Sequence, residues 1–303
     1  MNEVLNPQKD TAILSVRSAS KSFGEVQALN GVSFEVFPGE LVGVLGENGA
    51  GKSTLFSLIS GLNTPTSGSV SLMGNNPRHQ KARRNIGVTP QGTGVDPRMR
   101  VSDFLNFVGF HFGTRSLVEE ILEKFRLAHL SDKVIGGLSG GQQRLVSVAA
   151  AFLADAPLTI LDEPTTGLDT VTRSAIWESI RSITGKDRAL LVSSHYLEEI
   201  ENLCDRVIVM QKGKLIADSE TQSLLGASTG SVITLGGVGD RAFSGEGQAF
   251  EVIRNEADEV DLRASDVKQA LTSLAADGWP FDRIEISHPS LEQAFITMTE
   301  KEK

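Results

Sequence analysis

The residues best suited to chemistry form one glycine-rich run, Gly46-Glu47-Asn48-Gly49-Ala50-Gly51-Lys52-Ser53-Thr54. A glycine followed by four residues and Gly-Lys-Ser is the phosphate-loop pattern, in which backbone N–H groups surround a triphosphate. Lys52 is placed to contact the β- and γ-phosphates, and the Ser53 hydroxyl to ligate Mg²⁺. An apolar segment at 41–45 precedes the run and a helical pattern at 54–60 follows it. The sequence therefore predicts a strand, a loop and a helix that together bind a nucleotide.

Two carboxylates follow the most apolar segment of the chain, residues 158–161. In open α/β sheets ligands lie at the carboxyl ends of the strands, so Asp162 and Glu163 are expected to face the phosphates. Asp162 would hold the Mg²⁺ hydration shell and Glu163 would polarise the attacking water. His195 ends another apolar segment. A histidine at a strand end is more often structural than catalytic, but this one shares the predicted sheet edge with both carboxylates.

The remaining pattern supplies the elements that position these groups. Alternating segments within 11–37, and a third at 68–74, predict a small sheet. Helical periodicity runs from 102 to 130 and again from 142 to 153. Phe23 falls on a predicted loop between the first two strands, where an aromatic ring either stacks on an adenine or belongs to the core.

Bulk properties set limits on the function. The chain has 303 residues, 40% of them hydrophobic and 22% charged, which is ordinary for a globular protein of one large and one smaller domain. Its net charge of −9 gives no electrostatic reason to expect nucleic-acid or anionic-lipid binding. The single cysteine, Cys204, excludes an intrachain disulfide. The polar start shows no signal-peptide pattern, and no apolar run approaches the ~18 residues of a membrane helix. We therefore expect the chain not to span a bilayer by itself.

With these pieces in order, residues 12–218 resemble the ATP-binding subunit of ABC transporters. The most specific stretch is Leu138-Ser139-Gly140-Gly141-Gln142, which resembles the ABC signature. The other family motifs follow in sequence: Phe23 as the adenine-stacking residue, 46–54 as Walker A, Gln91 as the Q-loop, 158–163 as Walker B, Gly167-Leu168-Asp169 as the D-loop and His195 as the switch histidine. Two positions depart from the pattern, and one of them is Ala150, where arginine is common in relatives. Ungapped alignment places Leu145 where many relatives carry arginine, with Arg144 one position earlier.

The resemblance implies an α/β fold: a phosphate-loop NTPase core of the ABC ATPase type, with an antiparallel β-subdomain and a helical subdomain. It implies a head-to-tail homodimer with two ATP molecules between the subunits, and a separate transmembrane permease that binds the helical subdomain on the cytoplasmic face of the membrane. Glu163 and His195 are the implied catalytic residues, and Mg²⁺ would be held by Ser53, Gln91 and Asp162. The implied nucleotide contacts are Phe23, Gly46, Glu47, Asn48, Gly49, Ala50, Gly51, Lys52, Ser53, Thr54, Gln91, Ser139, Gly140, Gly141, Gln142, Asp162 and Asp169.

The chain is expected to divide into an ABC ATP-binding domain, residues 1–220, and an accessory α+β domain, residues 221–303. The helical subdomain would occupy about 92–157. Strand patterns at 231–235, 250–253, 260–262 and 284–286, with a helix at 266–276, define the accessory domain. Its ending, Pro289-Ser290-Leu291-Glu292 followed by Ala294-Phe295, resembles the drug- and antibiotic-exporter (ABC-2 type) branch. The domain is either a dimer-stabilising appendage or a sensor of substrate or regulator.

Two other functions are compatible with a phosphate loop. A soluble ABC ATPase acting on nucleic acid or ribosomes usually carries two nucleotide-binding units or a long coiled coil, and this acidic chain has a single signature and no long heptad run. A module that binds ATP without hydrolysing it would not need Glu163 and His195. The preferred interpretation is the ATPase subunit of a membrane exporter.

Overall fold

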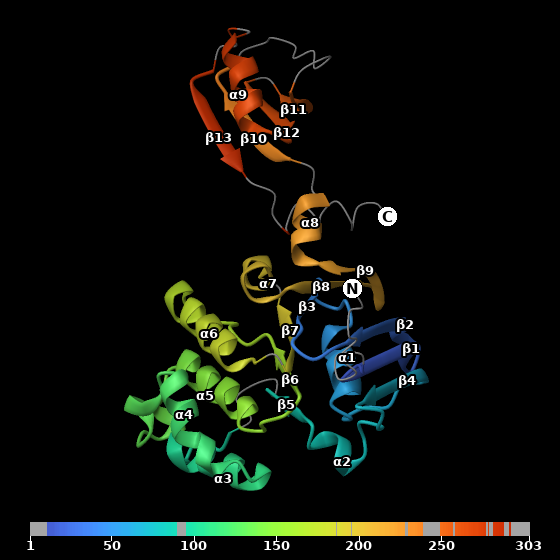
Figure 1. Cartoon of the computed structure of the whole chain (residues 1–303), viewed down its shortest axis with the longest axis vertical. Helices are drawn as coiled ribbons and strands as arrows, with labels where there is room; N and C mark the ends of the chain where they lie inside the picture. The colour runs from blue at the N-terminus through green and yellow to red at the C-terminus, as the bar shows by residue number, and fades with distance from the viewer. Residues whose placement is uncertain are drawn as a thin grey trace, which may run out of the picture. The chain divides into compact units, whose positions relative to one another are not determined.

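The computed structural model describes residues 11–89, 95–185, 187–194, 196–227, 230–238, 249–256, 258–276, 278, 281–287 and 291. The chain divides into two compact units, Met1–Ser219 and Glu220–Lys303, and each is considered by itself (Figure 1).

A six-stranded sheet forms the centre of the first unit, in the order β5-β6-β7-β3-β8-β9. β3 pairs in parallel with β7 and β8, and β6 pairs in parallel with β5 and β7. Every residue of β6 and β7 is buried, as expected for strands of a parallel sheet that is covered on both faces. The carboxyl ends of β3, β6 and β7 therefore share one edge. The strands are β3 (Leu41–Leu45), β5 (Ile86–Val88), β6 (Leu158–Asp162), β7 (Ala189–Ser194), β8 (Arg206–Gln211) and β9 (Lys214–Glu220).

A second, antiparallel sheet packs beside the first in the order β2-β1-β4. Its strands are β1 (Leu14–Phe23), β2 (Val26–Val36) and β4 (Ser67–Leu72). One hydrophobic cluster joins both sheets through side chains such as Leu14, Leu55 and Ile160. Phe23 is the last residue of β1 and pairs with Val26, so its predicted place on a loop is wrong. Cross-strand pairing continues the strand past the point where alternation of apolar residues stops.

Helices complete the first unit. α1 leads out of β3, whereas α3, α4 and α5 gather on the side of the sheet where β5 and β6 lie (Figure 1). Among the described residues no helix has both the length and the apolar character needed to cross a membrane. The helices are α1 (Lys52–Ile59), α2 (Gln80–Arg83), α3 (Val101–Phe112), α4 (Val118–Lys124), α5 (Gly140–Phe152), α6 (Thr170–Ile183) and α7 (Leu197–Leu203), with 3₁₀ turns at Arg115–Leu117, Ala128–Leu130 and Ile135–Gly137.

The second unit is a four-stranded antiparallel sheet in the order β11-β12-β10-β13, with α9 on one face. Its own core is built from residues such as Ile233, Leu235, Leu262 and Leu274. The elements are α8 (Thr221–Ala227), β10 (Ser231–Gly236), β11 (Glu251–Glu256), β12 (Glu259–Ala264), α9 (Val267–Ala276) and β13 (Arg283–Ser287). The four strands and α9 lie where the sequence predicts them, within three residues at each end.

Candidate functional site

The phosphate loop joins the end of β3 to the start of α1. Gly51 is the residue that precedes α1, and its φ of 103° lies in the left-handed region that glycine tolerates best. No side chain caps this helix, and its first turn contains no acidic residue. The N–H groups and the positive end of the helix dipole therefore face the loop, as an anion-binding site requires.

Lys52 carries the positive charge of this site. Its side chain is only 6% exposed, and Nζ donates hydrogen bonds to the carbonyl oxygens of Gly46 (2.6 Å) and Glu47 (3.2 Å). Burial lowers the pKa of Lys52, while the nearby charges of Glu163 and Asp162 act in the opposite direction. The loop thus encloses a cation that lies close to the carboxylates at the end of β6, and Ser53 is exposed beside it.

Asp162 is held by hydrogen bonds to one residue of β7 and to one residue directly after β5. Its Oδ1 accepts a hydrogen bond from the Ser193 hydroxyl at 2.5 Å, and its N–H donates to Thr89 Oγ1 at 3.0 Å. Both partners are buried. Neither Thr89 nor Ser193 is among the predicted site residues. The signal for Ser193 is the parallel register, which places it opposite Asp162.

Glu163 has an unusual backbone conformation, with φ at 49°. A left-handed φ is uncommon for a non-glycine residue and persists where surrounding contacts hold it. Here the Glu163 N–H donates to Ser193 Oγ (3.0 Å) and the Ser193 carbonyl oxygen (3.1 Å). The carboxylate accepts a hydrogen bond from Thr166 Oγ1 at 3.0 Å, which orients it. A half-buried, oriented carboxylate beside a phosphate loop is suited to accept a proton from water.

Arg144 links the signature helix α5 to this pair. Its guanidinium donates to the carbonyl oxygens of Asp162, Glu163 (3.0 Å) and Pro164 (3.3 Å). Burial lowers the pKa of Arg144, and the charges of Asp162 and Glu163 oppose that shift. The arginine at 144 thus makes a structural contact to the Walker B segment, although the alignment marked Leu145 as a departure from the family pattern.

Ser139 is the N-cap of α5 and forms a reciprocal capping box with Gln142. Gln142 N donates to Ser139 Oγ (3.2 Å), and Ser139 N donates to Gln142 Oε1 (3.1 Å). Ser139 and Gly140 are both exposed. A β-carbon on Gly141 would lie 2.6 Å from Leu168 Cδ2, so the signature packs tightly against the segment 167–169. The result is an exposed helix start that is held rigidly in place.

Asp169 caps the following helix, α6. Its carboxylate accepts hydrogen bonds from Thr172 N (3.0 Å) and Thr172 Oγ1 (2.7 Å). Phe23 is 49% exposed, and Lys21 Nζ lies 5.0 Å from its ring centroid. Gln91 and His195 lie outside the described residues, so of the predicted Mg²⁺ ligands the structure describes Ser53 and Asp162.

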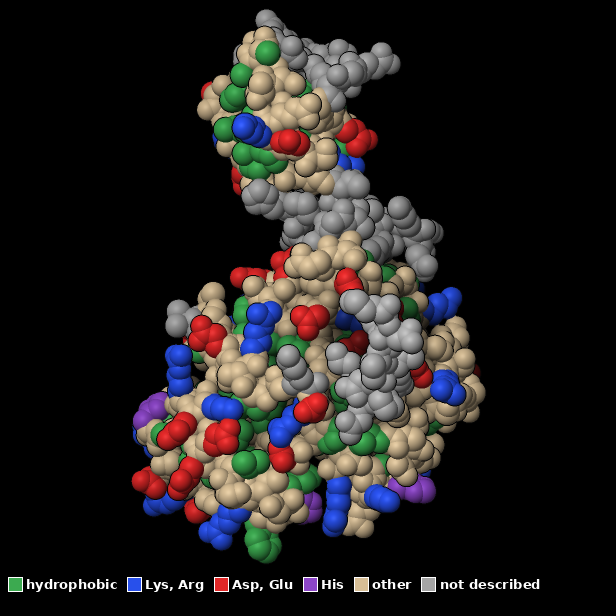
Figure 2. All heavy atoms as spheres, viewed as in Figure 1, with side chains coloured by type: hydrophobic (Ala, Val, Ile, Leu, Met, Phe, Trp, Pro, Cys, Tyr) green, Lys and Arg blue, Asp and Glu red, His purple; other side chains and the backbone are tan. Residues whose placement is uncertain are grey.

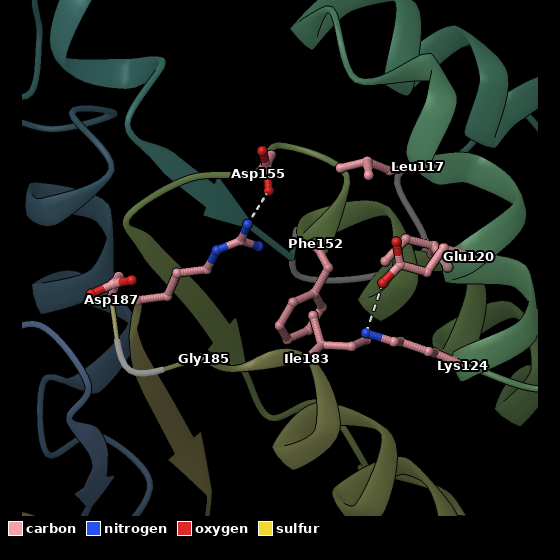
Figure 3. Close-up of a pocket in the computed structure, with 10 residues that line it drawn as sticks. Leu117, Glu120, Lys124, Phe152, Asp155, Ile183, Gly185 and Asp187 are labelled. Atoms are coloured by element: carbon pink, nitrogen blue, oxygen red, sulfur yellow. Dashed lines mark hydrogen bonds and ion pairs between the residues drawn. The ribbon is translucent and has the colours of Figure 1, made fainter.

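A separate cavity of about 310 Å³ lies between α4 and the segments that follow α5 and α6. Ion pairs between Asp155 and Arg188 and between Glu120 and Lys124 lie along it, with Phe152 between them (Figure 3). None of the predicted site residues lines this cavity. This cavity therefore arises where α4 packs against the segments that follow α5 and α6, and it is not part of the predicted nucleotide site.

Comparison with known proteins finds that this chain is similar to members of one family. A family model described as "ABC transporter" matches residues 29–166. The Nod factor export ATP-binding protein I of Rhizobium meliloti (strain 1021) is 36% identical over 306 residues, which cover 97% of this chain and 90% of that protein. The protein of the same name from Burkholderia lata is 38% identical over 226 residues, covering 72% of this chain and 74% of that protein.

Solved structures agree with the sequence relatives. An ATP-binding subunit of an ABC transporter superposes with a TM-score of 0.66 at 27% identity, over 71% of this chain and 92% of its own. An ATP-binding cassette in its ADP conformation gives a TM-score of 0.61 at 28% identity, over 71% and 95%. The predicted fold class, an α/β phosphate-loop core of the ABC ATPase type, is confirmed.

Proposed function

We propose that this chain, which belongs to the ABC transporter family of ATP-binding subunits, hydrolyses ATP to drive export through a separate membrane permease. Members of this family are ATPases, and this chain is one. The proposed direction of transport rests on relatives that are named for the export of Nod factor and align with nearly the whole chain. Cargo contacts are expected in the permease.

The observation that carries the proposal is the buried Lys52 ammonium inside the loop, next to Asp162 and Glu163. We assign the phosphates to the loop 46–54, with Lys52 at the β- and γ-phosphates. The donor set suits Mg²⁺, because the Ser53 hydroxyl is exposed beside Lys52 and the Asp162 carboxylate is held by Ser193. When bound, Mg²⁺ would offset charge on the phosphate oxygens.

Within this site Glu163 would accept a proton from the attacking water, since Thr166 orients its carboxylate. Lys52 would stabilise the charge that develops on the phosphoryl oxygens. The half-exposed ring of Phe23 offers a face for adenine. The proposed roles of Gln91 at Mg²⁺ and His195 as the switch histidine rest on the family pattern.

ABC ATPases dimerise and work with a membrane permease. For this chain we propose that the partner's Ser139, together with the N–H groups at the start of the partner's α5, approaches the γ-phosphate bound to Lys52. The exposure of Ser139 and Gly140 at the start of a 13-residue helix supports this arrangement. Asp169 caps α6, and in the proposed dimer its segment 167–169 would lie at the interface between the two subunits.

Glu163→Gln tests the proposal directly. This change keeps the size of the side chain but removes the proton acceptor, so turnover should fall by about 10²- to 10⁴-fold. Binding should survive, and the protein should accumulate as an ATP-bound dimer. Size-exclusion chromatography with light scattering, with and without Mg-ATP, measures the dimer.

Lys52→Ala in the same Glu163→Gln background is the matched control. Loss of a charged hydrogen bond worth about 1.5–3 kcal/mol should weaken ATP binding roughly 10- to 100-fold and abolish the ATP-dependent dimer. A Glu163→Gln protein that stays monomeric at saturating ATP contradicts the sandwich arrangement. Wild-type turnover in Lys52→Ala contradicts the assignment of the phosphate loop.

An apolar groove supports the proposed contact with the permease. A cavity of about 360 Å³ lies between α3, α5 and β5, lined by side chains that include Phe104, Val108 and Phe112. Phe107 and Phe110 of α3 are largely exposed, at 63% and 76%. Figure 2 shows hydrophobic side chains at the lower end of this unit, over α3. We assign this groove to a cytoplasmic segment of the permease, which would hold the chain on the cytoplasmic face of the cell membrane.

Phe104→Ser tests that contact, because it places a polar side chain in the groove and touches neither the loop nor the carboxylates. ATP binding by the isolated chain should be unchanged, while co-purification of a membrane partner, identified by mass spectrometry, should be lost. His129→Ser, on the 3₁₀ turn Ala128–Leu130, is an exposed control in the same part of the unit. Equal recovery of the partner with both variants contradicts the assignment.

A further inference from the structure

β13 is an edge strand of the sheet in the second unit. β13 pairs with β10 on one side, and all five of its residues are exposed. Among the described residues no strand pairs with its other side. Figure 1 shows β13 as an outer strand of this sheet. An unpaired edge presents a row of N–H and C=O groups that another strand can use.

The opposite edge of the same sheet is protected. β11 has a register shift between Val252 and Arg254, and a bulge of this kind disfavours edge-to-edge pairing. Arg254 also makes ion pairs across the sheet with Glu259 and Asp261. β13 has neither proline nor bulge, since its register with β10 is continuous from Ser287 to Arg283. One edge is therefore blocked, and within the described part of the chain the other edge is unpaired.

The side chains of β13 alternate between two kinds. Ile284 and Ile286 lie opposite Leu235 and Ile233, on the face that α9 covers. They remain 40% and 38% exposed at the rim of that core. Arg283 and Glu285 point to the other face, because successive residues of a strand alternate, and on that face Arg283 also pairs with Glu259 of β12 at 2.5 Å. A second strand placed beside β13 would therefore meet an apolar row on one face and a charged row on the other.

We propose that β13 pairs antiparallel with β13 of a second copy of this chain, about a two-fold axis at Ile284, so that two sheets become one. An axis normal to the sheet keeps each residue on its own face. With the axis at Ile284, Arg283 lies opposite the partner's Glu285, and Ile284 lies opposite the partner's Ile284. An axis at Arg283 or at Glu285 would place like charges opposite each other, which is unfavourable. Charge complementarity thus favours a second copy as the partner, and it favours the register at Ile284 over those at Arg283 and Glu285.

This contact differs from the ATP-dependent one in its requirements. It uses backbone hydrogen bonds and a short apolar row, so it needs no nucleotide. A five-residue strand pair is much smaller than the roughly 1,600 Å² of a typical stable interface, and alone it should be weak. Two chains held by this contact would face each other at high effective concentration, which favours ATP-driven closure between the same two chains.

Cysteine cross-linking of the full chain tests the proposal, because the native cysteine should not react. The only native cysteine, Cys204, is buried, and burial raises the pKa of its thiol. In the proposed register residue 284 faces itself, with β-carbons about 4.5–5.5 Å apart. Ile284→Cys should give a disulfide-linked dimer with diamide in the absence of nucleotide. Ile253→Cys, on the protected edge strand β11 and 38% exposed, is the matched control and should stay monomeric.

The register has its own test. A mixture of Arg283→Cys chains and Glu285→Cys chains should cross-link faster than either variant alone, because these positions face each other only across the proposed axis. Adding Glu285→Arg to Ile284→Cys should slow cross-linking about tenfold, since two like-charged pairs replace two opposite-charged pairs. Adding Arg283→Glu as well should restore much of the rate, because opposite charges again face each other across the axis, although the pair of Arg283 with Glu259 within the chain is lost.

The outcomes separate this proposal from the function proposed above. If Ile284→Cys cross-links no faster than Ile253→Cys, with and without ATP, pairing through β13 is wrong even when Glu163→Gln still gives an ATP-dependent dimer. If cross-linking persists in a Lys52→Ala background, the contact is independent of nucleotide, as proposed. A strict requirement for ATP would overturn that independence. Thermal unfolding of each variant confirms that it is folded.

Discussion

Arg144 donates hydrogen bonds to the backbone of Asp162 and Glu163, the two carboxylate residues of the site. Three carbonyl oxygens in succession, those of residues 162–164, accept hydrogen bonds from one guanidinium. The middle one belongs to Glu163, whose left-handed φ of 49° costs on the order of 1–3 kcal/mol unless surrounding contacts stabilise it. The guanidinium and Ser193 together supply these contacts, so the direction of the Glu163 carboxylate depends on a residue of the signature helix.

Arg144→Lys should lower kcat and leave the KM for ATP nearly unchanged. A lysine keeps the charge but cannot reach three carbonyl oxygens with one planar group. The free energy of unfolding should fall by about 2 kcal/mol, as for loss of hydrogen bonds to a charged donor. Steady-state ATPase assays and urea unfolding measure both effects. Arg126→Lys is the control, because Arg126 is exposed and pairs with the exposed Glu178. An unchanged kcat in Arg144→Lys shows that Glu163 does not need this support.

At the residue scale, the sequence is informative where chemistry is local. The phosphate loop and the pair Asp162-Glu163 are recognisable because their residue types are contiguous. Thr89 and Ser193, which hold Asp162, are far from it along the chain, and strand pairing alone brings them close. The positive φ of Glu163 was also not predictable, since glutamate rarely adopts that conformation.

At the scale of elements, α6 and α7 are joined to the end of β7 by a buried ion pair. Arg173 Nε lies 3.5 Å from Glu199 Oε1, and the Glu199 side chain is 2% exposed. Glu199 Oε2 accepts a hydrogen bond from Ser194 Oγ at 2.5 Å. The Arg173 guanidinium also stacks on the Tyr196 ring and donates to the Leu168 carbonyl oxygen at 3.3 Å. Arg173 therefore contacts the 167–169 segment and Tyr196 directly, and it reaches Ser194 through Glu199. Ser194 and Tyr196 are the residues on either side of His195 in the chain.

Removing one member of this pair should be more harmful than removing both. Arg173→Met alone removes the guanidinium beside the buried Glu199 carboxylate, at a cost of about 3–5 kcal/mol in the free energy of unfolding. In Arg173→Met with Glu199→Gln much of that loss should be recovered, because no uncompensated charge remains. Urea unfolding of both single variants and the double variant measures the coupling. Additive losses would show that the ion pair contributes little. ATPase activity should follow the same order if the pair positions the 167–169 segment.

The extent of elements is harder to predict than their order. α5 begins at Gly140, two residues before the amphipathic pattern, because the Ser139–Gln142 capping box starts the helix there. β1 extends to Phe23 because β2 pairs with it along its length. α8, over Thr221–Ala227, is not among the predicted elements. Caps and pairing decide where these elements start and end, and neither is visible in hydrophobic periodicity.

At the scale of the whole molecule, each of the two units has its own hydrophobic core. The cluster of the first unit includes Leu14, Leu55 and Ile160, and that of the second includes Ile233 and Leu262. The phosphate loop and both carboxylates lie in the first unit. Domains with separate cores unfold as separate cooperative units unless a large interface couples them. A ligand that binds one unit should therefore stabilise chiefly that unit.

Calorimetry of the Glu163→Gln chain, which cannot consume the nucleotide, should show two unfolding transitions. ATP at 100 times its Kd stabilises the native state by about 2.7 kcal/mol. For a domain of 150–250 residues each kcal/mol shifts Tm by about 2–4 °C, so Mg-ATP should raise the larger transition by roughly 5–10 °C. The smaller transition should move much less, because the second unit binds no nucleotide and gains only the weak β13 contact in the ATP-bound dimer. Adding Lys52→Ala should abolish the shift and leave both transitions in place, which identifies the larger one as the first unit. A single transition that ATP shifts as a whole contradicts independent units, because it means that nucleotide binding stabilises the second core through the first.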